Sequence, residues 1–226
     1  MSRRTLLLPL LAAALLAGCG SSGSKSNGEA SKTADQIVAD SKAAVADASS
    51  VHIAGAGTAN GTALALDLHL VADKGGQGRV TANGITFDMV RIDQTAYFKA
   101  DASFWKNFGG AAAALLLQGR WLKAPADTGQ LATFTPLTDI NKLFTALLGS
   151  HGTLAKGDET TINGQPAIAV NDTTNGGTLY VATTGKPYPL AVQKGGKGRI
   201  DFTDWDEPYT ITAPDGAVDL SKLTGG

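Results

Sequence analysis

Leucine at every second position along one segment constrains the fold of this chain most strongly. Leu64, Leu66, Leu68 and Leu70 alternate with residues that include the charged Asp67. Successive side chains of a strand point to opposite faces of a sheet, so this spacing places all four leucines on one face. We therefore predict a strand with one face in an apolar interior, and a sheet that a second layer covers.

Short apolar runs between turn residues predict further strands. These runs lie at 79–82, 85–93, 96–100, 121–123, 158–162, 167–171, 179–182, 190–193, 199–203 and 209–212. The glycine-rich stretch 75–78 predicts a turn. Asn163-Gly164 predicts a tight hairpin, because Asn-Gly favours a type I′ turn. Short strands joined by short turns indicate antiparallel pairing.

Three segments have the pattern of helices. Thr33 and Gln36 match a capping box at the start of the first helix. A second helix is predicted over 102–118, with a break at Gly109-Gly110, and a third is predicted from the cap Asp139 to Gly149. The expected class is α+β, with a large curved antiparallel sheet, a half-barrel, and a few helices covering its concave face. Because no second linker or internal repeat occurs, we expect one domain over 33–226.

The N-terminus has the pattern of an export signal. Arg3 and Arg4 precede a short apolar stretch, and Leu16-Ala17-Gly18-Cys19 follows it. These four residues resemble the lipobox of bacterial lipoproteins. The resemblance implies that residues 1–18 are a signal peptide, that cleavage occurs between Gly18 and Cys19, and that Cys19 carries fatty acids such as palmitate. The polar stretch after Cys19, through residue 32, is expected to be a flexible tether.

Residues that would indicate catalysis or cofactor binding are sparse. Cys19 is the sole cysteine, so a thiol nucleophile or an internal disulfide is not expected in the folded part. The histidines, His52, His69 and His151, show no spacing typical of a zinc site, and no dinucleotide or phosphate-loop motif is complete. We therefore predict neither an enzyme nor a cofactor or metal site. A formal net charge of −1 without basic blocks argues against nucleic acid as a partner.

One acidic cluster leaves an alternative open. Asp201, Asp204, Asp206 and Glu207 surround Trp205, and carboxylates in such a group are the ligands that calcium prefers. The cluster lacks the glycine and the later glutamate of an EF-hand loop. A solvated strand end is therefore the preferred interpretation, and a calcium site is the alternative.

The order of several short motifs is similar to that of a known family. Ser50-Val51-His52, the run 119–123, Pro187-Tyr188-Pro189-Leu190, the run 199–205 and Ala213-Pro214 resemble the LppX/LprG family of actinobacterial lipoproteins. This resemblance implies a LolA/LolB-like fold, in which a curved antiparallel sheet wraps over helices around an apolar cavity for acyl chains. It also implies binding of lipid or glycolipid and its carriage between the membrane and the outer envelope.

The function expected from the sequence is therefore that of a lipid-binding lipoprotein on the outer face of the cytoplasmic membrane, with a membrane transporter as a further partner. An anchored module that binds a protein partner or regulates the envelope, without a small ligand, is the alternative. The residues expected to line the cavity come from the leucine-rich strand and from two helices: Leu64, Leu66, Leu68, Leu70, Ala112, Ala113, Leu116, Leu143 and Leu147.

Overall fold

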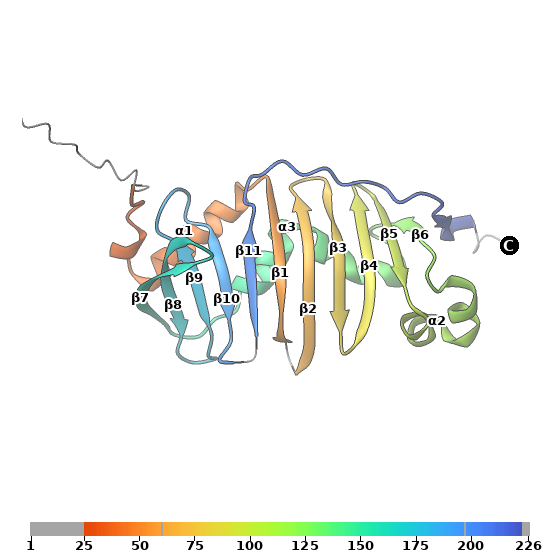
Figure 1. Ribbon diagram of the computed structural model, residues 1–226, viewed down its shortest axis with the longest axis horizontal. Helices are drawn as coiled ribbons and strands as arrows, with labels where there is room; N and C mark the ends of the chain where they lie inside the picture. The colour runs from red at the N-terminus through yellow and green to blue at the C-terminus, as the bar shows by residue number, and fades with distance from the viewer. Residues whose placement is uncertain (1–24, 60, 197, 223–226) are drawn as a thin grey trace, which may run out of the picture.

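The protein is organised around one open sheet that is not closed into a barrel (Figure 1). The computed structural model describes residues 25–59, 61–196 and 198–222, and within them twelve strands pair in the order β12-β6-β5-β4-β3-β2-β1-β11-β10-β9-β8-β7. The strands are β1 (Ser50–Ala59), β2 (Thr62–Val71), β3 (Gly75–Ala82), β4 (Ile85–Ile92), β5 (Thr95–Ala100), β6 (Leu122–Pro125), β7 (Leu154–Ile162), β8 (Gln165–Asp172), β9 (Thr178–Ala182), β10 (Pro189–Gln193), β11 (Arg199–Thr203) and β12 (Val218–Asp219). All neighbouring strands are antiparallel except β12 and β6, which are parallel.

Two α-helices and a 3₁₀ segment lie along one face of this sheet. They are α1 (Ala34–Ala46), α3 (Ile140–Leu148) and η2 (Gln130–Thr138). In Figure 1, α3 passes behind the central strands, and α1 lies behind the strands at the β7 end. Thr33 and Gln36 form the predicted capping box of α1, and the side chain of Asp139 accepts a hydrogen bond from the Lys142 amide at the start of α3. No helix in the described part of the chain is long and apolar enough to cross a bilayer.

The leucine-rich strand forms the centre of the core, as its period predicts. Leu68 and Leu70 are completely buried, Leu66 is nearly so and Leu64 is half-buried. Phe144 of α3 packs in the same apolar cluster. The fold class expected from the sequence is confirmed, with the parallel β6–β12 pair as a small departure.

The helix α2 (Ala102–Leu117) does not cover the sheet, contrary to expectation. It contacts β4 and β5 at one end of the molecule (Figure 1). The expected break is confirmed at Gly110, whose φ of 79° and ψ of −175° are not helical. Beyond this break Leu115 and Leu116 are 78% and 66% exposed, whereas Ala114 is buried in the core.

The glycine-rich stretch predicted as a turn belongs to β3 instead. A Cβ atom on Gly78 would lie 2.0 Å from the carbonyl oxygen of Asp67, and one on Gly76 would lie 2.4 Å from a methyl group of Leu70. Glycine is needed here because neighbouring atoms occupy the space of a side chain, not because the chain reverses. The reversal occurs just before it, around Asp73, whose φ is 57°.

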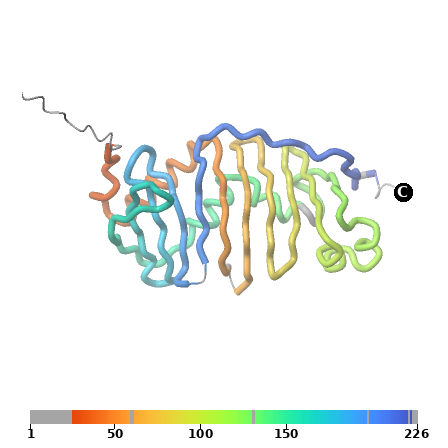
Figure 2. Tube along the Cα trace, in the orientation of Figure 1, coloured from red at the N-terminus to blue at the C-terminus, as the bar shows by residue number. Residues whose placement is uncertain are grey.

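The segment 209–212, predicted as a strand, belongs to no strand. After β11 the chain runs across the ends of the central strands toward β6 and β12 (Figure 2). It is held there by side chains: Gln77 donates to the Tyr209 hydroxyl over 2.6 Å and accepts from the Thr212 amide over 3.1 Å. We call residues 204–217 the crossing segment.

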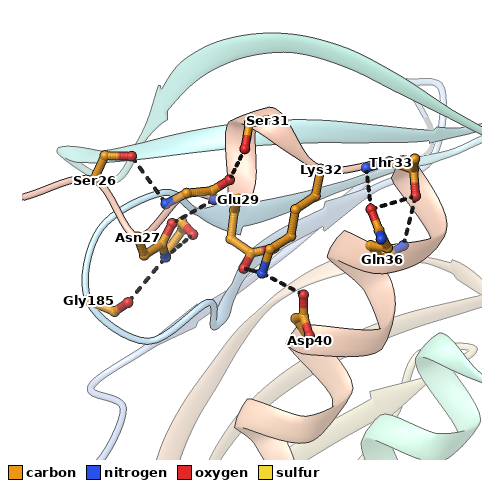
Figure 3. A network of polar contacts seen from close by, with 11 residues as sticks. Ser26, Asn27, Glu29, Ser31, Lys32, Thr33, Gln36, Asp40 and Gly185 are labelled. Atoms are coloured by element: carbon orange, nitrogen blue, oxygen red, sulfur yellow. Dashed lines mark hydrogen bonds and ion pairs between the residues drawn. The ribbon is translucent and has the colours of Figure 1, made fainter.

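The residues just before α1 pack on the sheet. The predicted tether, which runs through residue 32, therefore includes residues that belong to the folded part. The Asn27 side chain donates to the carbonyl oxygens of Ala182 and Gly185, and Glu29 is buried. Figure 3 shows the Lys32 ammonium between Glu29 and Asp40, at 2.6 and 2.7 Å. The folded part therefore begins by Ser26 rather than at Thr33. Residues 1–18, predicted as a signal peptide, and Cys19, the predicted lipidation site, lie outside the described residues.

Candidate functional site

A cavity of about 370 Å³ lies between α3 and the strands β1, β2, β10 and β11. Its walls are largely apolar. Leu64 and Leu66 come from β2, Leu143 and Leu147 come from α3, and Ile200 comes from β11. This is the helix-covered face of the sheet.

A second cavity of about 200 Å³ adjoins the first toward β8 and β9. The two cavities share Leu147, Val192, Gln193 and Lys194 as lining residues. The inner wall of the second cavity is again apolar and its rim is polar: Val38, Leu148, Leu154, Val170 and Leu179 line it together with Asp172, Asn175 and His151. We call the two cavities together the apolar groove.

Local sequence explains why the groove is left open. Along α3, Ile140, Leu143 and Leu147 recur at helical spacing and face the sheet, whereas Ala146 at the edge of this stripe fills little space. On the sheet side, Gly57 and Gly198 bring no side chain into the groove. Gly198 cannot be replaced by a larger residue, because a Cβ atom there would lie 2.1 Å from the carbonyl oxygen of Ala56. Small residues thus leave space that bulky ones would have filled.

The structure brings four of the nine predicted lining residues together. Leu64, Leu66, Leu143 and Leu147 line the larger cavity. Leu68 and Leu70 are on the same face of β2, but they are fully buried in the core, where other side chains cover them.

The remaining three predicted lining residues lie on α2, which contacts β4 and β5 rather than the strands that line the groove. Ala112 and Leu116 are exposed, Ala113 is half-buried, and none of the three lines the groove. The prediction that this run of alanines borders the binding cavity is not confirmed, because α2 contacts β4 and β5 at the other end of the sheet, and Ala114 of the run is buried in the core there.

Two basic residues contribute to the lining of the larger cavity. Ile200 points into it, so the side chain of Arg199 points to the opposite face, where its guanidinium is held by Asp201 and by the Asn163 side chain, the latter at 3.0 Å. Lys194 is exposed and forms no ion pair within the described residues. The Lys194 ammonium at the rim is therefore solvated by water.

The acidic residues near Trp205 do not converge on a common point. Asp201 contacts Arg199, whereas Asp206 accepts from Lys186 at 2.8 Å and from the Tyr188 hydroxyl at 2.7 Å. Burial alone would raise the pKa of Asp206, but hydrogen bonds from Lys186, Ser49 and Tyr188 hold that pKa well below its usual range. These carboxylates hold segments of the chain together, so the strand-end interpretation fits them better than a calcium site.

Two histidines that are far apart in sequence are brought into contact, which the sequence reasoning missed. His52 of β1 lies opposite His69 of β2, and their rings stack at 4.0 Å. A signal was available: position 52 lies seven residues before the end of β1 at Ala59, and position 69 lies seven residues after the start of β2 at Thr62, as the partners in a tight hairpin must. Burial, and then the neighbouring His52, lower the pKa of His69.

No protein-family model matches the sequence, and no curated protein matches it either. Among solved structures, LprF from Mycobacterium bovis is similar at 17% identity, with 85% of this chain and 99% of that chain covered and a TM-score of 0.55. The lipoprotein LppX of Mycobacterium tuberculosis is 17% identical over 79% of this chain and 99% of that one, with a TM-score of 0.49. A chain of the MucA/MucB complex of Pseudomonas aeruginosa is 15% identical over 85% and 61%, with a TM-score of 0.36. The likeness to LprF shows the fold, and it confirms the fold that the sequence resemblance implied.

Proposed function

We propose that this chain is an exported, lipid-anchored envelope protein that binds the acyl chains of a lipid or glycolipid in the apolar groove and carries them between the membrane and the outer envelope. The observation that carries this proposal is the pair of adjoining apolar cavities between α3 and the sheet. The larger cavity, at about 370 Å³, is within the range of small-molecule sites, roughly 300–1,000 Å³.

The energetics of the groove suit a hydrocarbon ligand. Each buried methylene contributes about 0.8 kcal/mol, so about ten methylenes would contribute about 8 kcal/mol before the costs of association. The leucines of β2 and α3 offer no hydrogen bonds that a polar ligand would need. Lys194 is exposed at the rim, so the end of a ligand that lies beside it would remain in contact with water.

The proposed location rests on Cys19. A tether between an acylated Cys19 and the folded part would hold the groove near the outer face of the cytoplasmic membrane. Stable anchoring requires more than one acyl chain, which lipoprotein processing provides.

The test compares two alanine-to-phenylalanine variants of the full chain, purified in mild detergent. Ala146→Phe places a large ring at the wall of the larger cavity, whereas Ala112→Phe places the same ring on α2, away from the groove. Both positions are exposed, so both variants should keep their stability within about 0.5 kcal/mol.

The readout is mass spectrometry of solvent extracts, in which non-covalent lipid separates from the acylated protein. We expect a defined lipid in the wild type and in Ala112→Phe, and at least a fivefold loss in Ala146→Phe. Equal lipid in all three proteins, at the level of empty micelles, would refute the proposal.

A second candidate function is favoured by α2. Phe108, Leu115 and Leu116 are exposed on this helix, and exposed apolar patches mark interaction sites. An envelope module that binds a protein partner through α2 predicts that Leu115→Ser with Leu116→Ser abolishes the complex and leaves lipid content unchanged.

A further inference from the structure

His52, Asp67 and His69 form a cluster on the face of the sheet opposite the groove. Leu66, Leu68 and Leu70 point to the helices, so the intervening residues of β2 point the other way. His52 on β1 pairs with His69 across the ladder, and Asp67 precedes His69 by two residues on the same face. One ligand atom from each of the three side chains lies within 4.8 Å of the other two.

The contacts within the cluster fix its arrangement. The Nε2 atom of His52 is 2.8 Å from Oδ1 of Asp67. On its other side, the Nδ1 atom of His52 is 3.4 Å from the Thr203 hydroxyl and 3.6 Å from an Asp204 carboxylate oxygen. The ring of His69 lies between those of His52 and Tyr209, with centroid distances of 4.0 and 4.2 Å.

Space for water lies on one side of the cluster. A cavity of about 130 Å³ is lined by His52, His69, Asp204 and Tyr209, among others, but not by Asp67. A water molecule takes about 30 Å³ of liquid volume, so this cavity can supply water to a metal held by the two imidazoles.

The geometry points to a site for a divalent transition metal of the zinc type, and we propose that the imidazoles of His52 and His69 and the carboxylate of Asp67 are its ligands. Two imidazoles and one carboxylate are a ligand set that zinc accepts, with a remaining position for water. Calcium and magnesium, which prefer oxygen ligands, do not fit this set.

The strand pairing favours binding. The paired strands hold the two histidines opposite each other, so little backbone order is lost on binding. Binding requires only that the two stacked rings tip toward each other by side-chain rotation.

The competing interpretation is a cluster that binds no metal. In that case Asp67 only orients His52, and His69 only supports the crossing segment through Tyr209. The two interpretations differ in what Zn²⁺ alone does to the protein.

The experiment is a titration of the untagged full chain with Zn²⁺ by calorimetry, supported by the visible absorption of Co²⁺. The variants are His52→Gln, His69→Gln and Asp67→Asn. His151→Gln is the matched control, because His151 is exposed in a loop before β7. Cys19→Ser controls for binding by the thiol.

We expect one Zn²⁺ per chain and at least a tenfold loss of affinity in each cluster variant, with changes under twofold in both controls. Asp67 is 70% exposed, so Asp67→Asn remains informative if a histidine variant unfolds. The proposal is overturned if the wild type binds no stoichiometric Zn²⁺, if Asp67→Asn and the folded histidine variants bind it unchanged, or if His151→Gln or Cys19→Ser loses as much affinity as they do.

Discussion

Truncation of Leu68 tests the central claim that β2 directs its leucines into the core. Leu68 is completely buried, between Ile53 of β1 and Gly78 of β3. Replacing a buried leucine by alanine costs about 2–5 kcal/mol, depending on how far the neighbours close the space. Because Gly78 has no side chain to move in, we expect a loss in the upper part of that range, about 3–5 kcal/mol. For a chain of this length this corresponds to a fall in Tm of about 6–20 °C.

The assay is urea unfolding followed by tryptophan fluorescence. Trp205 stacks on Tyr188 at 4.3 Å and packs near Phe144, so unfolding exposes it. Leu116→Ala is the control: Leu116 is 66% exposed, and its truncation should change stability by less than about 0.5 kcal/mol. A loss below about 1 kcal/mol in Leu68→Ala, or similar losses in both variants, would refute the burial assignment.

Three further predictions concern separate parts of the chain. Cys19→Ser should abolish incorporation of labelled palmitate in a bacterial host, and a variant that keeps the label would contradict the lipobox interpretation. The amides of Asn175 and Gly152 lower the pKa of Asp172 to about 2 from an ordinary value of 3.8, so its folded form stays ionised to lower pH than its unfolded form. The stability from Asp172 is therefore present above about pH 4 and lost as the pH falls toward 2, and urea midpoints of Asp172→Asn should depend less on pH in that window than those of the wild type. Gly164→Ala should cost about 1–2 kcal/mol in urea unfolding, because Gly164 has a φ of 80° in the β7–β8 turn, and an unchanged midpoint would contradict the type I′ assignment.

Sequence patterns correctly predicted the features that depend on only a few neighbouring residues. The capping box at Thr33, the Asn163-Gly164 turn and the break at Gly110 each depend on a few neighbouring residues, and all three are present. The leucines of β2 were placed correctly for the same reason, since alternation along a single strand is enough to identify its buried face.

Predictions failed where contacts with distant segments decide the conformation. Gly75–Gly78 has the composition of a turn, but its glycines are required by the close approach of β2 and β4 on either side. The segment from Tyr209 to Thr212 has a strand-like sequence, yet its partners are side chains of β2 and β3 rather than a neighbouring strand. The path of α2 after Gly110 likewise cannot be derived from helix propensity, because it depends on the direction that the break imposes.

The same distinction explains why the groove was predicted in part and the histidine cluster was missed. The leucines of the groove are identified by the periods of single elements, β2 and α3, although the same period also selects Leu68 and Leu70, which lie in the core. The histidine cluster instead depends on register, because one residue of slip between β1 and β2 would move His69 to the other face. That register follows from the short turn between β1 and β2, where Gly61 has a φ of 79°. A glycine that seems to indicate only a flexible turn thus takes part in determining which polar side chains meet across the sheet.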